Sequence, residues 1–121
     1  MSVANPKCYV RLKEPIPGID HIKFIDRRQF AEAHGSIDGI ASRLGVDKIN
    51  DFYVFSGDPV RWYPASEGLA TVRAVRGFIE KDESPEYQAI VASTLDVLRK
   101  LDELLGKAQA RGIDFCVVGN Y

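Results

Sequence analysis

The stretch that decides the fold is residues 84–121, SPEYQAIVASTLDVLRKLDELLGKAQARGIDFCVVGNY. It opens with Ser84-Pro85-Glu86, an order typical of a helix N-terminus. Serine caps free N–H groups there, proline needs no N–H, and a carboxylate suits the positive end of the helix dipole. Arg111-Gly112 indicates the helix end, because glycine readily adopts the left-handed conformation found there. The stretch predicts a helix over about residues 85–111, roughly 40 Å long at about 1.5 Å per residue, and a strand over 113–118.

Apolar residues recur along this predicted helix at alternating steps of three and four, which is the spacing of one helix face. The face comprises Tyr87, Ile90, Thr94, Val97, Leu101, Leu104 and Ala108, and is widened by Val91, Leu95, Leu98 and Leu105. A stripe this broad is typical of a helix packed in a globular core. The opposite face is charged, with Asp96 and Lys100 at the favourable spacing of four, and we expect it to face solvent.

Composition predicts a single domain over residues 1–121, because 45% of the 121 residues are hydrophobic and can form a substantial core. Sixteen basic and seventeen acidic residues leave a formal net charge of -1 without a run of one sign, so nucleic acid is not an expected partner. No apolar run approaches the ~18 residues that span a bilayer, and the N-terminus lacks a signal-peptide pattern. We therefore expect a cytoplasmic protein without a membrane partner.

The sequence predicts no catalytic residue, metal site or cofactor. Cys8 and Cys116 lack C-x-x-C spacing and fall in predicted strands, so we expect two buried thiols, which would be neighbours if those strands pair. His21 and His34 belong to no ligand or nucleophile pattern.

The rest of the chain predicts one strand and three further helices, with one ambiguous segment. Residues 7–13 alternate as a strand. Asp26 caps a helix over 27–33 that stops at Gly35, and Ser36 caps a second helix that ends at Gly45. Residues 49–55 are aromatic and β-branched, and we interpret them as a strand.

A third helix begins at Pro64, and its inward residues are Leu69, Val72, Val75, Phe78 and Ile79. A short linker after it makes this helix and the long one an antiparallel hairpin. The fold class is therefore α+β. We expect a small sheet of two or three strands, formed by the N- and C-terminal strands and covered by about four helices.

Two surface sites are candidates for binding. Large aromatic residues and arginine dominate protein-binding hot spots, and they cluster around the turn at Gly57-Asp58-Pro59. The cluster comprises Phe52, Tyr53, Phe55, Arg61, Trp62 and Tyr63, and its alternative role is to complete the core. Arg61, Arg73 and Arg76 form a candidate anion site, with a solvated helix face as the alternative.

The block over residues 62–74, WYPASEGLATVRA, resembles a pattern in short bacterial proteins that carry a domain of unknown function. The predicted long helix and the exit Arg111-Gly112-Ile113-Asp114-Phe115 belong to the same resemblance, which covers roughly the C-terminal half. Its motifs concern packing. Some proteins of this size and style are immunity partners of toxins, although no residue here is specific to that role. The resemblance implies a bacterial source.

We expect a small non-enzymatic protein that binds another protein or a second copy of itself as a homodimer. A toxin-neutralising or regulatory role is the most concrete form of this hypothesis. The alternative is a binder of an anionic small molecule, or a small enzyme, with a cleft near residues 58–76 that uses Asp58, Arg61 and Arg73.

Overall fold

The computed structural model describes residues 7–21, 23–55, 58–81 and 88–120. The elements follow in the order β1 (Lys7–Leu12), α1 (Arg27–Leu44), the 3₁₀-helix η1 (Ile49–Phe52), β2 (Tyr53–Phe55), α2 (Ala65–Lys81), α3 (Gln88–Ala110) and β3 (Phe115–Asn120). The fold is α+β, as predicted. Across the described residues it has three α-helices rather than about four, and a mixed three-stranded sheet that includes the first and last strands.

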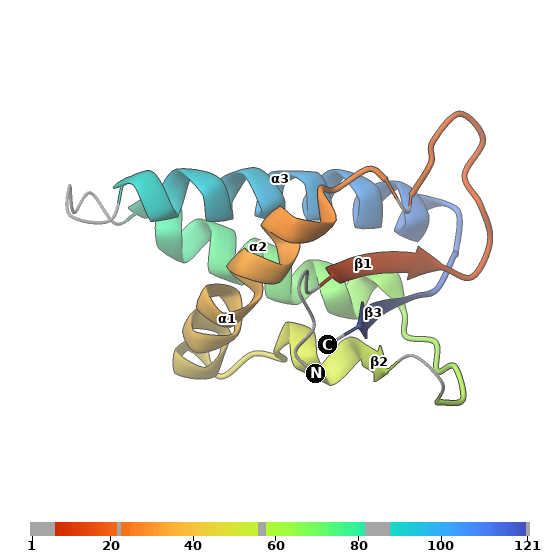
Figure 1. Ribbon diagram of the computed structural model, residues 1–121, viewed down its shortest axis with the longest axis horizontal. Coiled ribbons are helices and arrows are strands. Elements are labelled where there is room, and N and C mark those ends of the chain that lie inside the picture. Colours follow the sequence, from red (N-terminus) through yellow and green to blue (C-terminus); the bar gives the residue numbers. More distant parts are fainter. Residues whose placement is uncertain (1–6, 22, 56–57, 82–87, 121) are drawn as a thin grey trace.

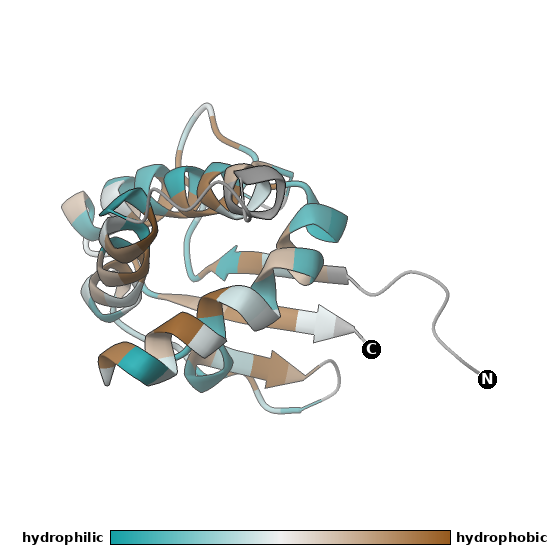
Figure 2. Ribbon diagram, turned by 90° about the vertical axis from the view of Figure 1, so that its left-hand side faces the viewer, coloured by the Kyte–Doolittle hydropathy of each residue, from teal (hydrophilic) through white to brown (hydrophobic). Residues whose placement is uncertain are grey.

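The sheet has the strand order β1-β3-β2, so β3 lies in the middle. β3 is antiparallel to β1, with Val10 opposite Val117, and parallel to β2, with Val54 opposite Val118. Figure 2 shows the three strands side by side, with β3 between β1 and β2 and β1 pointing in the opposite direction to the other two.

The two faces of the sheet have different neighbours, because successive side chains of a strand point to opposite sides. On one face, Cys8, Val10 and Leu12 lie opposite Gly119, Val117 and Phe115. Apart from the glycine, all of these residues belong to the core that packs against the helices. Cys116 lies opposite Arg11 on the other face. Cys8 and Cys116 are both buried free thiols, as expected, but they lie on opposite faces and are not neighbours.

The helix α1 runs without a break through Gly35 and Ser36, so the two short helices predicted on either side of Gly35 are one. The buried residues Phe30, Ala33, Ile37 and Ala41 follow one helical face across this point. Burial of that face outweighs the roughly 1 kcal/mol cost of a helical glycine. The left-handed C-cap is Gly45, with a φ of 71°, and Asp26 caps the N-terminus by accepting from the Gln29 N–H at 2.8 Å.

Residues 49–52 form a 3₁₀-helix, so the strand predicted over 49–55 is correct only for Tyr53–Phe55. The turn is stabilised by two carboxylates. Asp51 accepts from the Lys48 N–H at 2.8 Å, and Asp38, from the middle of α1, accepts from the Ile49 N–H at 2.6 Å. Capping by carboxylates at both places explains why an aromatic, β-branched segment does not begin as a strand.

The helices α2 and α3 pack against each other along their length and run in opposite directions, as the colour gradient of Figure 1 shows. The core side of α3 comprises Thr94, Val97, Leu98, Leu101, Leu104, Leu105 and Ala108, all buried. Gly112, with a φ of 66°, follows its end as predicted. The predicted start near Ser84-Pro85 lies outside the described residues.

On α2 the predicted core residues Leu69, Val72, Val75 and Ile79 are buried, but Phe78 is 39% exposed. The prediction that Phe78 points into the core is therefore wrong. None of the helices in the described ranges combines the length and the apolar character needed to cross a bilayer.

Candidate functional site

The six residues of the predicted binding cluster do not stay together. Phe52 is 2% exposed, and its ring lies 5.2 Å from that of Phe115 and 5.5 Å from that of Tyr63, between centroids. Phe52 is therefore a core residue, which was the alternative considered for the cluster. The others lie at the surface, but on two separate parts of it.

Part of the cluster surrounds a hollow of about 290 Å³ beside β2, which we call the β2 hollow. It is lined by Tyr53, Val54, Phe55, Asp58, Pro59, Arg61 and Tyr63. The strand supplies the first three residues, and the segment that returns toward α2 supplies the rest. Tyr63 holds this second segment against β3. Its N–H donates to the carbonyl of Phe115 at 2.8 Å, and its carbonyl accepts from the Phe115 N–H at 2.9 Å.

Two exposed apolar residues lie at this hollow. Phe55 is 55% exposed and Val60, between two residues of the lining, is 42% exposed. The Tyr53 and Phe55 rings meet edge to face at 5.0 Å between centroids, which fixes both rings on one wall. Asp58 and Arg61 add one charge of each sign to the lining. The site can therefore hold an apolar side chain and orient a polar group beside it.

Trp62 does not line the hollow. It is half-buried, and the Arg11 guanidinium lies over its ring at 5.6 Å from the centroid. Arg11 is also the cross-strand partner of Cys116 on the sheet face away from the helices. The pair Arg11 and Trp62 therefore belongs to the cover of that face, where Cys116 is fully buried.

The three arginines of the predicted anion site are not brought together. Arg73 and Arg76 both contact Asp102 of α3, at 3.4 and 3.3 Å, and Arg76 also pairs with Glu80 at 2.6 Å. Arg61 precedes α2, whereas Arg73 lies eight residues along it, about 12 Å from Ala65. Only Asp58 and Arg61 of the small-molecule alternative share a site.

A second polar group lies between α1 and the sheet, and sequence reasoning missed it. The Nε2 atom of His34 lies 3.4 Å from Oδ2 of Asp38, and the His34 ring meets Tyr53 edge to face at 5.7 Å between centroids. His34 and Asp38 stand four apart on one helix, which is a spacing that the sequence does show. Their proximity to Tyr53 depends on the fold alone.

The Cys8 thiol lies close enough to Asp38 to be affected by its charge, and it is a poor nucleophile. Burial, and secondarily the charge of Asp38, raises the pKa of the Cys8 thiol to about 12, so it stays protonated at neutral pH. Burial also raises the pKa of Cys116 and lowers that of His21. Among the described residues, no group of three or more His, Cys, Asp or Glu side chains is close enough together to hold a metal ion.

The β2 hollow and its exposed aromatic wall are thus the part of the predicted cluster best suited to binding. Comparisons of the chain with protein-family models, with curated proteins and with solved structures give no match.

Proposed function

We propose that the protein is a small, non-enzymatic binding module that takes an apolar side chain of a partner protein into the β2 hollow. The observation that supports this most directly is the 55% exposure of Phe55 on the wall of the hollow. Burying a side chain of this size is worth about 1.5–3 kcal/mol, so a partner that covers it gains affinity. Its edge-to-face contact with Tyr53 keeps the ring in place before binding.

The lining residues suit an anchor contact. Tyrosine and arginine are common in binding hot spots, and Tyr53, Tyr63 and Arg61 surround the position that an inserted side chain would take. The volume of about 290 Å³ lies at the low end for small-molecule sites, which are typically ~300–1,000 Å³. An anchor side chain fits this size better than a substrate does.

The partner is another protein or a second copy of the chain, and a regulatory or toxin-neutralising role in the cytoplasm remains the most concrete form of the proposal.

Selection of short random peptides displayed on phage, with the wild-type protein as bait, tests the proposal. Peptides with an apolar or aromatic anchor are expected. Their affinity, measured by fluorescence anisotropy, should fall about tenfold or more for Phe55→Ser, a loss of ~1.4 kcal/mol. Phe78→Ser is the matched control, because Phe78 is exposed on α2 and does not line the hollow.

Light scattering measures the molar mass in solution and so tests whether the partner is a second copy of the chain. A wild-type dimer that Phe55→Ser converts to monomer would identify the partner as a second copy and support the same surface. Peptides that bind wild type, Phe55→Ser and Phe78→Ser equally, together with a monomeric wild type, would overturn the proposal.

A further inference from the structure

The four large hydrophobic residues that are exposed in the described part of the chain fall into two groups. Phe55 and Val60 lie at the β2 hollow, and the other two, Leu44 and Phe78, are each 39% exposed. The second pair belongs to a separate groove of about 450 Å³ between the end of α1 and the C-terminal half of α2. We call it the α1–α2 groove. It is lined by Leu44, Val46, Arg73, Ala74, Gly77, Phe78 and Lys81.

The floor of the groove is shallow and apolar. Ala74 and Gly77 lie one turn apart on α2, and a Cβ atom at Gly77 would meet nothing within 4 Å. A partner's backbone can therefore approach α2 closely at this point, and Leu44 and Phe78 belong to the same lining. A glycine inside a helix costs about 1 kcal/mol of stability relative to alanine. Packing within the chain does not require glycine at residue 77, because an alanine side chain there would lie in open space.

The charged residues of the groove are all positive. Arg73 and Lys81 are the only charged side chains among its lining residues. They stand eight positions apart on α2, which corresponds to about 12 Å along the helix. Arg73 contacts Asp102 at 3.4 Å, but its side chain is 59% exposed, so a partner's carboxylate can still reach it.

We propose that the α1–α2 groove binds an acidic amphipathic helix of a partner protein. Apolar residues of that helix would pack between Leu44 and Phe78, and carboxylates about two turns apart would meet Arg73 and Lys81. Docking of an amphipathic helix into an apolar groove is a recurring mode of recognition. This surface is distinct from the β2 hollow, so the proposal goes beyond the function proposed above.

The charge pattern selects this occupant over two others. A second copy that docked through the same groove would bring Arg73 and Lys81 against their own counterparts, and like charges across an interface disfavour association. A fatty acid carries a single carboxylate, which can meet only one of two cations about 12 Å apart. A helix can present a carboxylate to each.

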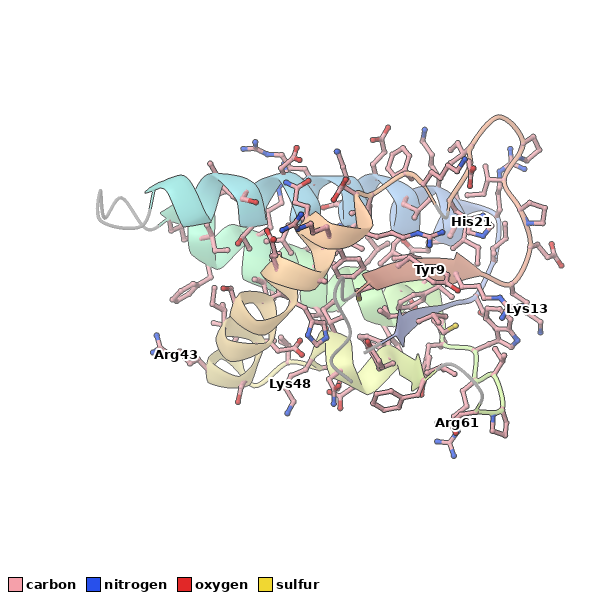
Figure 3. All side chains as sticks on the ribbon, in the orientation of Figure 1. Tyr9, Lys13, His21, Arg43, Lys48 and Arg61 are labelled. Atoms are coloured by element: carbon pink, nitrogen blue, oxygen red, sulfur yellow. The ribbon has the colours of Figure 1, made fainter. Side chains whose placement is uncertain are left out.

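The two surfaces lie far apart on the molecule. In Figure 3, Arg43, which adjoins Leu44, projects at one end, and Arg61 of the β2 hollow projects at the other. A helix in the α1–α2 groove would leave the β2 hollow open. The protein can therefore hold two partners at once.

Two designed helical peptides test the proposal. Both carry leucines at spacings of three and four along one face, and the flanking positions are glutamate in one peptide and lysine in its twin. We expect the glutamate peptide to bind wild type, and the lysine twin to bind at least about tenfold more weakly, by fluorescence anisotropy. Phe78→Ser should lower the affinity for the glutamate peptide by about tenfold, whereas Phe55→Ser should not.

Two further variants separate recognition from folding. Lys81→Glu should lower or reverse the preference for the glutamate peptide over its lysine twin. Lys13→Glu is the control: it makes the same change in net charge at the opposite end of the molecule (Figure 3) and should leave that preference unchanged. Gly77→Leu should fill the groove and weaken binding while the helix is stabilised, because leucine is the better helix former. Urea unfolding of each variant checks its fold.

Equal binding of the two peptides would overturn the proposal, as would glutamate-peptide binding that Phe78→Ser and Gly77→Leu leave unchanged. A wild-type dimer that Phe78→Ser dissociates, or displacement of the glutamate peptide by a fatty acid at lower concentration than by the peptide itself, would assign the groove to a different occupant.

Discussion

The phenol of Tyr53 lies directly across the α-carbon of Gly119, in the space that a β-carbon at residue 119 would occupy. The two residues come from neighbouring parallel strands, β2 and β3. The Tyr53 ring also makes edge-to-face contacts with His34 and Phe55. The absence of a side chain at residue 119 therefore sets the position of the ring that forms one wall of the β2 hollow.

Gly119→Ala should destabilise the protein by about 1–3 kcal/mol, because the new methyl group displaces the Tyr53 ring and with it the edge of the sheet. Urea unfolding measures the change in the free energy of unfolding. In a Tyr53→Leu background, where the phenol is absent, the same substitution should cost much less. Equal costs in both backgrounds would mean that the contact does not set the requirement for glycine.

The two glycines of α2 at residues 68 and 77 should respond to alanine with opposite signs. A β-carbon at Gly68 would collide with the Phe115 ring and lie 3.0 Å from Cδ1 of Leu105, so Gly68→Ala should cost about 1–3 kcal/mol. Gly77 has open space, and Gly77→Ala should stabilise the protein by about 0.5–1 kcal/mol. Thermal and urea unfolding compare the two, and Gly106→Ala, also in open space, serves as the control on α3.

Asp38→Ala should cost about 1–2 kcal/mol, since its carboxylate accepts from the N–H groups of Ile49 and Asn50 at the start of η1. Glu32→Ala is the matched control on the same helix, because Glu32 is exposed and forms a surface ion pair with Arg28 at 3.4 Å. Its cost should stay within about 0.5 kcal/mol. Similar costs for the two substitutions in urea unfolding would exclude a special role for Asp38.

Stability should fall as pH rises from about 9 toward about 12, because the folded protein holds the Cys8 proton more tightly than the unfolded chain does. The ordinary pKa of 9.0 is raised to about 12 by burial and by Asp38, so the contribution of the thiol is complete below pH 9 and is lost above it. Urea unfolding of wild type and Cys8→Ala across this range measures the effect as the difference between their pH dependences. Parallel curves would contradict it.

Local signals predicted much of the fold. The alternation of residues 7–13, the broad apolar face of residues 94–108 and the glycine at residue 112 each identified an element that the structure contains. These signals succeed because the side chains that create them also make the contacts that stabilise the element. The fold class and the membership of the two terminal strands in one sheet followed from them.

The errors have a common physical cause, which is that long-range contacts overrode local preferences. Gly35 resembles a helix end, but the apolar face of α1 continues in phase across it and is buried. Ile49–Phe52 resembles a strand, but Asp38, eleven residues earlier, caps it as a 3₁₀-helix. Phe78 has the spacing of a core residue, yet it lies at the edge of the buried face of α2.

The candidate site was predictable only in part. Composition around residues 52–63 indicated an aromatic surface, and Phe55 and Arg61 do line a hollow. The division of the cluster among the core, the hollow and the outer sheet face depends on the pairing of Tyr63 with Phe115, which no local pattern shows. The α1–α2 groove joins residues about thirty positions apart and has no sequence signal, because the spacing of Phe78 predicted a core residue.

The central position of β3 governs the order in which a newly made chain can assemble. Within the described residues, β1 and β2 do not pair with each other, and both pair with β3 in residues 115–120, which are synthesised after both. The helices can form early from local contacts, but a nascent chain that has not reached residue 115 presents two strands with open edges. Such edges are prone to aggregation, so early termination of synthesis would leave a hazardous fragment rather than a smaller stable domain.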